Sequence, residues 1–329
     1  MADRRKLIFD CDTGTDDAVA LMSLLLSDNV DVIGVTSVHG NRPVENTTDN
    51  NLRLVEFLGM DVPVYKGCAC ALVRGLSKGR ELNTRMQRVR AVVDGEEIRI
   101  HEATLKLPAA KRGARPEHAC SFIVDTLRAA REPIDIAAVG PLTNIAVALR
   151  MAPEIAQKIG TLYIMGGGLR TGNRTPVAEA NFYDDPEAAE IVLTSGANIL
   201  LGPIEGNVSG ATYTLDDIAA IEALGNRTGR WTAQLLRDFI ARCRILFGGD
   251  PASCCIHDYA AVAPAIDPLT ATDVRREICR VDFSGGMADG QLVVDRRGAP
   301  AGDSTVRVVC GMDAARTHAL LLSLLKKAE

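Results

Sequence analysis

The chain has 329 residues, 47% of them hydrophobic and 24% charged, with a net charge of −5 at pH 7. This balance is typical of a globular protein with a large core, and the acidic excess argues against nucleic acid or an anionic membrane as a partner. No apolar run reaches the roughly 18 residues that a membrane span needs, and no signal-peptide core precedes the first predicted strand. The 9 cysteines match no zinc-site spacing, so reduced thiols and a cytoplasmic location are expected.

Apolar, β-branched runs alternate with helical patterns along the chain. The predicted elements, in chain order, are strand 6–9, helix 16–26, strand 30–38, helix 43–58, strand 62–65, helix 118–130, strand 134–139, helix 142–150, strand 161–165, helix 186–195, strand 199–201, a helical region at 215–248, strands 291–295 and 305–310, and helix 313–326. This alternation predicts an α/β fold with a mostly parallel central sheet flanked by helices. Residues 67–116 lack periodicity and are expected to form loops and an insertion. No repeat or linker divides the chain, so a single domain over residues 1–329 is expected.

Four carboxylates crowd the turn between the first predicted strand and helix: Asp10, Asp12, Asp16 and Asp17. Like charges this close repel strongly where water is scarce. A hard divalent cation with oxygen ligands would remove the repulsion. Asp16 and Asp17 could instead serve only the positive end of the helix dipole, with Asp10 as a turn residue. Four carboxylates around a glycine at the bend, Gly14, favour the metal site.

The carboxyl ends of other predicted strands also carry glycine or polar residues, at 38–41, 139–141 and 165–168. In parallel sheets the binding crevice lies beyond these ends. The three segments and the aspartate run 10–17 are therefore expected to converge on one site.

Two further clusters are weaker on their own. Residues 165–168 form a glycine-rich turn that matches neither a P-loop nor a dinucleotide fingerprint. Just beyond it lie Asn173, Glu179 and Asn181, whose amide and carboxylate groups suit the hydroxyls of a sugar. His257-Asp258 is a pair of a kind that most often lies on the surface or is satisfied in the core.

Several segments, in order along almost the whole chain, carry a resemblance to a known family. They are Asp10-Cys11-Asp12-Thr13-Gly14-Thr15-Asp16-Asp17-Ala18, Val38-His39-Gly40-Asn41, Val139-Gly140-Pro141-Leu142-Thr143-Asn144-Ile145-Ala146, Met165-Gly166-Gly167-Gly168, Ala178-Glu179-Ala180-Asn181, Asp185-Pro186-Glu187-Ala188-Ala189 and His257-Asp258. Together they resemble the nucleoside hydrolases (nucleoside N-ribohydrolases) of the inosine-uridine-preferring type. The resemblance implies a Rossmann-like fold, assembly as a homodimer or homotetramer, and hydrolysis of ribonucleosides to free base and ribose through an oxocarbenium-like transition state.

The resemblance also implies a Ca²⁺ site. Its ligands would be Asp12, Asp17, Asp258 and the main-chain carbonyl of Val139, with Asp10 orienting them from behind. Asp12 would also act as general base for the attacking water, whose pKa the cation lowers.

The remaining site residues follow from the same resemblance. The residues that would bind the ribose are Asp16 at the 2′-hydroxyl, Asn173, Glu179 and Asn181 at the 3′- and 5′-hydroxyls, and Asn41 and Met165 along the pocket wall. His257 would protonate the leaving base, because a histidine that titrates near neutrality suits this role. His101 and His39 are further possible pocket residues.

Two other functions stay open. A Mg²⁺-dependent phosphatase of the aspartyl-phosphate type also begins with Asp-x-Asp after a strand, but it needs Thr or Val where this chain has Gly14. It also leaves His257-Asp258 unexplained. A non-catalytic ribonucleoside- or sugar-binding protein could use the same scaffold, although the intact Asp12 and His257 argue against it. Segments 67–100 and 202–208 depart from the family pattern, so the preferred base is open.

Overall fold

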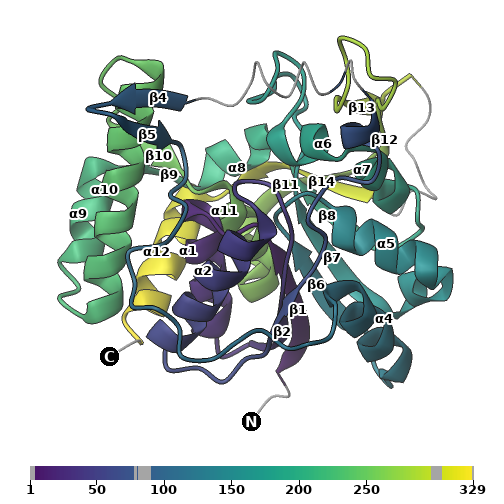
Figure 1. The fold of residues 1–329 in the computed structure, drawn as a ribbon, viewed down its shortest axis with the longest axis horizontal. Helices are drawn as coiled ribbons and strands as arrows, with labels where there is room; N and C mark the ends of the chain where they lie inside the picture. Colours follow the sequence, from purple (N-terminus) through teal and green to yellow (C-terminus); the bar gives the residue numbers. More distant parts are fainter. Residues whose placement is uncertain (1–3, 78–79, 81–89, 298–305, 328–329) are drawn as a thin grey trace.

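The computed structural model describes residues 4–77, 80, 90–297 and 306–327. Its main sheet contains β1 (Arg5–Cys11), β2 (Val30–Ser37), β3 (Val64–Lys66), β6 (Ile134–Ala138), β7 (Ile159–Met165), β8 (Ile199–Gly202), β11 (Ala271–Arg276) and β14 (Val306–Met312). The strand order is β11-β14-β8-β7-β6-β1-β2-β3 (Figure 1). Neighbouring strands are parallel except for the edge pair β11–β14. The predicted α/β fold with a mostly parallel sheet is therefore confirmed.

Helices cover both faces of this sheet (Figure 1). One layer consists of α1 (Thr15–Leu25), α2 (Val44–Phe57), α9 (Leu215–Glu222), α10 (Arg227–Phe247), α11 (His257–Ile266) and α12 (Ala314–Leu325). The other consists of α4 (Ala119–Ala129), α5 (Thr143–Met151) and α7 (Pro186–Leu193). Successive side chains of a strand point to opposite faces, so Leu7 and Phe9 of β1 pack into the first layer and Ile8 into the second.

Shorter elements complete the described chain. They are the helices α6 (Ala180–Asp184) and α8 (Ile204–Gly210), the 3₁₀ turns η1 (Arg74–Leu76), η2 (Pro153–Lys158) and η3 (Pro268–Thr270), and the strand pairs β4 (Arg90–Val93) with β5 (Glu96–Arg99), β9 (Thr212–Thr214) with β10 (Ser253–Cys255), and β12 (Ile278–Val281) with β13 (Leu292–Asp295). The hairpins β4–β5 and β12–β13 lie near the top of Figure 1. Within the described ranges, no helix has the length and apolarity that a membrane crossing requires.

Each predicted strand and helix corresponds to an observed element, with ends that differ by a few residues. Thr305, the first residue of the predicted strand 305–310, lies outside the described residues. The segment 67–116 holds η1 and the β4–β5 hairpin, and this hairpin was not predicted. The helix α11 was not predicted either.

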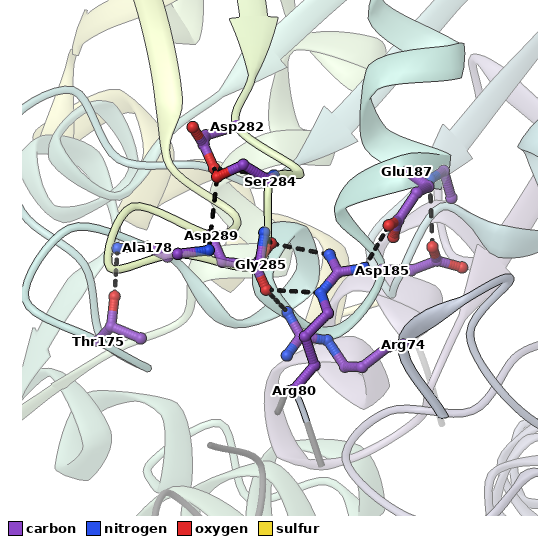
Figure 2. Close-up of polar contacts among 12 residues, drawn as sticks. Arg74, Arg80, Thr175, Ala178, Asp185, Glu187, Asp282, Ser284, Gly285 and Asp289 are labelled. Atoms are coloured by element: carbon purple, nitrogen blue, oxygen red, sulfur yellow. Dashed lines mark hydrogen bonds and ion pairs between the residues drawn. The ribbon is translucent and has the colours of Figure 1, made fainter. Parts of the chain in front are cut away.

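A buried ion network joins η1 to the loop between β12 and β13 (Figure 2). The guanidinium of Arg74 donates to Asp289 Oδ2 at 2.7 Å, and Arg80 donates to both carboxylate oxygens of Asp289 at 2.8 and 3.0 Å. Arg80 also pairs with Glu187 at the start of α7, and Arg74 lies 3.9 Å over the ring of Tyr183 in α6. The network therefore fixes two surface segments against α6 and α7.

Candidate active site

The strand ends are in register at the carboxyl edge of the sheet. Asp10 of β1 pairs with Thr36 of β2 and with Ala138 of β6, and Ala138 pairs with Ile164 of β7. The loops that follow these strands therefore start from one edge, as predicted. This edge brings Asp10 near Ile164, which is 154 positions away in the chain.

The aspartate loop is held in shape by its last carboxylate. Asp17 accepts hydrogen bonds from the main-chain N–H of Asp12 at 3.1 Å and of Gly14 at 2.9 Å. The side-chain amide of Asn41 donates to the same carboxylate at 3.3 Å. Asp17 therefore fixes the conformation of the aspartate loop and also binds Asn41 of the loop after β2.

The carboxylate of Asp12 lies in a narrow space between two glycines. The main-chain N–H of Asn41 donates to its Oδ2 at 2.6 Å. A Cβ added to Gly140 would lie 2.9 Å from its Oδ1, and one added to Gly40 would collide with its Oδ2. Gly40 also has a φ of +154°, which disfavours other residues. The glycines of both predicted segments therefore make room for this one carboxylate.

Three carboxylates form a compact group beside Asp12. Oxygens of Asp16, Asp17 and Asp258 lie within 4.8 Å of one another, and Asp258 reaches the group from the first turn of α11. Burial and then the charge of Asp17 raise the pKa of Asp16 to about 7. Burial and then the charges of Asp16, Asp17 and Asp12 raise the pKa of Asp258 well above its ordinary value. The crowding of these carboxylates and the all-oxygen donor set fit a hard divalent cation.

The predicted ligand set differs in part from this group. Asp12 lies next to it, where burial and then the charge of Asp17 raise the pKa of Asp12. The carbonyl of Val139 accepts a hydrogen bond at 2.7 Å from the side-chain amide of Asn181. Asp16, predicted to bind sugar only, belongs to the compact group.

Asp10 lies directly behind the loop. Its Oδ1 accepts hydrogen bonds from Thr36 at 2.6 Å and from the side-chain amide of Asn144 at 2.8 Å, and burial raises its pKa to about 7. Asn144 also donates to the carbonyl of Ser37, so it connects the ends of β1 and β2. Asn144 was given no role from the sequence, although it lies in the quoted segment that follows β6.

Four of the predicted sugar-binding residues, Met165, Asn173, Glu179 and Asn181, lie near the start of α6. Glu179 accepts hydrogen bonds from the N–H groups of Gly167 and Asn181, both at 2.9 Å, and burial raises its pKa to about 7. The amide of Asn181 donates to the carbonyl of Met165 at 3.1 Å, and Asn173 accepts from the first N–H of α6 at 2.9 Å. The structure thus places these residues next to one another at the ends of β6 and β7.

His257 is the first residue of α11, adjacent to Asp258. Its Nδ1 lies 3.6 Å from the sulfur of Cys255. Burial lowers the pKa of His257 to about 4. This lowered pKa departs from the expectation that His257 titrates near neutrality.

The other two histidines have different surroundings. His101 covers the aspartate loop, where its Nδ1 accepts from the N–H of Thr15 at 3.1 Å. Burial, followed by the charge of Arg242, lowers the pKa of His101 to about 3. His39 instead contacts the hydroxyl of Thr143 through Nε2 at 3.0 Å.

Arg174 is a charged neighbour of the site that sequence reasoning missed. It pairs with Asp184 at 3.0 Å, and the charge of Asp184 is the largest cause of its raised pKa. The charges of Glu179 and Asp12 act in the same direction. The only signal in the sequence was its position directly after Asn173.

Comparison with known proteins places the chain in a family. The model of the family described as "Inosine-uridine preferring nucleoside hydrolase" matches residues 7–319. The pyrimidine-specific ribonucleoside hydrolase RihB of Escherichia coli (strain SE11) is 32% identical over 318 residues, which cover 94% of each chain. A purine-preferring ribonucleoside hydrolase from Gardnerella vaginalis superposes with a TM-score of 0.83 at 28% identity, over 98% of this chain and 99% of the other. A plant nucleoside hydrolase superposes with a TM-score of 0.84 at 28% identity and the same coverage. The chain therefore belongs to the nucleoside hydrolase family, whose members are enzymes that cleave N-glycosyl bonds.

Proposed function

We propose that this chain is a Ca²⁺-dependent ribonucleoside hydrolase that releases free base and ribose. The observation that supports this most directly is the group of Asp16, Asp17 and Asp258, with Asp12 beside it. Membership of the nucleoside hydrolase family supports the same reaction. The named relatives include pyrimidine-specific and purine-preferring enzymes, so the assay must cover both kinds of base.

The residues that would hold the cation are Asp12, Asp17 and Asp258, together with the carbonyl of Val139. Ca²⁺, when bound, supplies positive charge against these oxygens and lowers the pKa of water beside it. Asp16 would accept a hydrogen bond from the ribose 2′-hydroxyl from its place in the same group. Asp10, fixed by Thr36 and Asn144, would keep the loop in position.

Asp12 would take a proton from the attacking water as it approaches C1′. The N–H of Asn41 fixes one carboxylate oxygen of Asp12, so the other can accept that proton. Before a cation binds, burial and the charge of Asp17 raise the pKa of Asp12. The residues that would orient the ribose are Asn41, Met165, Asn173, Glu179 and Asn181.

We further propose that residues 1–329 form one domain. We also propose that the chain assembles as a homodimer or homotetramer. The family match over residues 7–319 supports a single unit, and so does the sheet, which joins β1 and β14 from the two ends of the chain.

Calcium should stabilise the fold through the carboxylate group. We expect the melting temperature to be higher in excess Ca²⁺ than in chelator, because saturation at about 100 times Kd adds about 2.7 kcal/mol. In Asp258→Asn the Ca²⁺ response should be lost, whereas melting in chelator should move upward since one repelling charge is gone. Differential scanning calorimetry checks both. Asp273→Asn, at an exposed pair with Arg275, is the control that should keep the full response. An unchanged Ca²⁺ response in Asp258→Asn would refute the site.

Departure of the nucleobase should depend on protonation by His257. We expect His257→Ala to slow inosine or uridine hydrolysis about 100-fold or more, but p-nitrophenyl riboside much less, because that leaving group needs no proton. With a pKa of about 4, the fraction of protonated His257 falls as pH rises. The ratio of the wild-type rate to the His257→Ala rate on natural nucleosides should therefore shrink toward alkaline pH. Steady-state rates on both substrates test this. Equal losses on the two substrates would exclude His257 as the proton donor.

A further inference from the structure

Two thiols lie next to Asn144, the residue that donates a hydrogen bond to Asp10 behind the aspartate loop. The sulfur atoms of Cys68, in the loop after β3, and Cys120, in the first turn of α4, lie 3.8 Å apart. Both are free thiols; Cys68 is partly exposed and Cys120 is buried. We propose that peroxide converts Cys68 and Cys120 into a reversible disulfide that weakens the support of Asp10 and lowers hydrolysis. The second part of this proposal rests on the proposed function.

The two cysteines have unequal chemical roles. The two sulfurs share a hydrogen bond in which either can be the donor, and this contact with Cys120 lowers the pKa of Cys68. The same bond and burial raise the pKa of Cys120. The partly exposed sulfur is therefore the one that forms thiolate and meets an oxidant, and the buried sulfur stands next to it to resolve the product.

The chemistry balances with hydrogen peroxide as the oxidant. The Cys68 thiolate attacks one peroxide oxygen, the O–O bond breaks, and with one proton the products are a sulfenic acid and water. The Cys120 sulfur then attacks the Cys68 sulfur and displaces the hydroxyl, which leaves as a second water with the proton of the Cys120 thiol. Two thiols lose two electrons and one peroxide gains them. A dithiol reductant reverses the step.

The adjacent cysteines Cys254 and Cys255 are less well placed to form a disulfide with each other. Cys254 and Cys255 are adjacent residues of β10, so their side chains point to opposite faces of the strand. Cys70 is exposed and close to Cys68 in sequence, which makes it the matched control.

Both cysteines contact Asn144. The N–H of Cys68 donates to Asn144 Oδ1 at 2.8 Å, and the Cys120 sulfur lies 3.6 Å from the carbonyl of Asn144. A Cβ added to Gly67 would collide with the amide of Asn144, so the loop main chain packs tightly against this side chain. The other end of the Asn144 amide donates to Asp10 at 2.8 Å.

Disulfide formation must therefore move this contact. The sulfurs have to close from 3.8 Å to about 2.05 Å. Cys120 is fixed by its helix, so the loop of Cys68 must take up most of the movement and draw the Asn144 amide with it. Asp10 would then lose part of its hydrogen-bond support behind the proposed cation ligands, a kind of change that costs 10- to 100-fold in other metal sites.

The test treats the purified full chain with hydrogen peroxide and then blocks the remaining thiols. Peptide mapping by mass spectrometry should find a Cys68–Cys120 cross-link in the wild type and in Cys70→Ser, and none in Cys68→Ser. Ribose release should fall about tenfold with the cross-link in the first two proteins and return after dithiothreitol. Cys68→Ser should keep its rate through the same treatment.

The outcomes distinguish the disulfide, its effect on Asp10 and the proposed hydrolysis. Absence of the Cys68–Cys120 cross-link, or a cross-link between other cysteines in its place, overturns the thiol pair. A quantitative cross-link with an unchanged rate overturns its effect on Asp10. A reduced protein without any nucleoside hydrolysis would contradict the proposed function instead, because the cross-link is measured without turnover.

Discussion

Replacing Asp12 by alanine should lower kcat for every nucleoside substrate by about 1,000-fold or more. The variant loses the proposed proton acceptor for water and one proposed cation ligand in a single change. Its carboxylate occupies a space that Gly40 and Gly140 leave open, with one oxygen fixed by Asn41. Asp17 is not free to take over this position, because its two oxygens already accept hydrogen bonds from the loop N–H groups. Steady-state kinetics at saturating Ca²⁺ measures the loss.

Two further variants make this result specific. Asp12→Asn keeps the shape and the acceptor for the N–H of Asn41 but cannot take a proton, so it should lose nearly as much activity as Asp12→Ala. Asp31→Ala, at an exposed position of β2, should leave kcat unchanged. Near-normal turnover in either Asp12 variant would mean that another group is the base.

Replacing Asp289 by alanine should destabilise the fold by about 3–5 kcal/mol. Asp289 is buried, and its two oxygens accept hydrogen bonds from Arg74 and Arg80, which are buried as well (Figure 2). Without it, Arg80 keeps Glu187 as a partner, but the buried charge of Arg74 loses its carboxylate. Such an uncompensated charge is costly in the interior. Urea unfolding followed by circular dichroism measures the change.

A matched ion pair on the surface provides the control. Asp273 pairs with Arg275 at 2.6 Å, but both side chains are exposed. Asp273→Ala should therefore shift the urea midpoint very little, since water screens such pairs. An equally small shift in Asp289→Ala would show that the network in Figure 2 adds no stability.

The central part of the fold was predictable because its strands are short apolar runs buried on both faces. β1, β6 and β7 are of this type, and their parallel register places their ends at one edge. The helix α11 escaped prediction because almost all of it is buried, including its alanines and Pro264, so no polar face gives a helical period. The β4–β5 hairpin did carry a signal, Asp94-Gly95, and both residues have positive φ in the turn.

The site was predictable in location but not in detail. The family resemblance brought the aspartate run and His257-Asp258 into one hypothesis. The hydrogen bonds of Asn144 to Asp10 and the charge of Arg174 near Glu179 depend on contacts between distant segments, which spacing does not encode. The lowered pKa of His257 has the same origin, since burial of its ring is a property of the folded helix start.

One measurement tests the proposed function most directly. Purified protein is given inosine, guanosine, adenosine, uridine, cytidine and, separately, p-nitrophenyl phosphate, each with Ca²⁺ and with chelator. We expect free ribose from at least one nucleoside in Ca²⁺, its loss in chelator, its return when Ca²⁺ is restored, and no phosphate release. Phosphate release from p-nitrophenyl phosphate, nucleoside binding without any ribose, or ribose release that is unchanged by chelator would contradict a Ca²⁺-dependent ribonucleoside hydrolase.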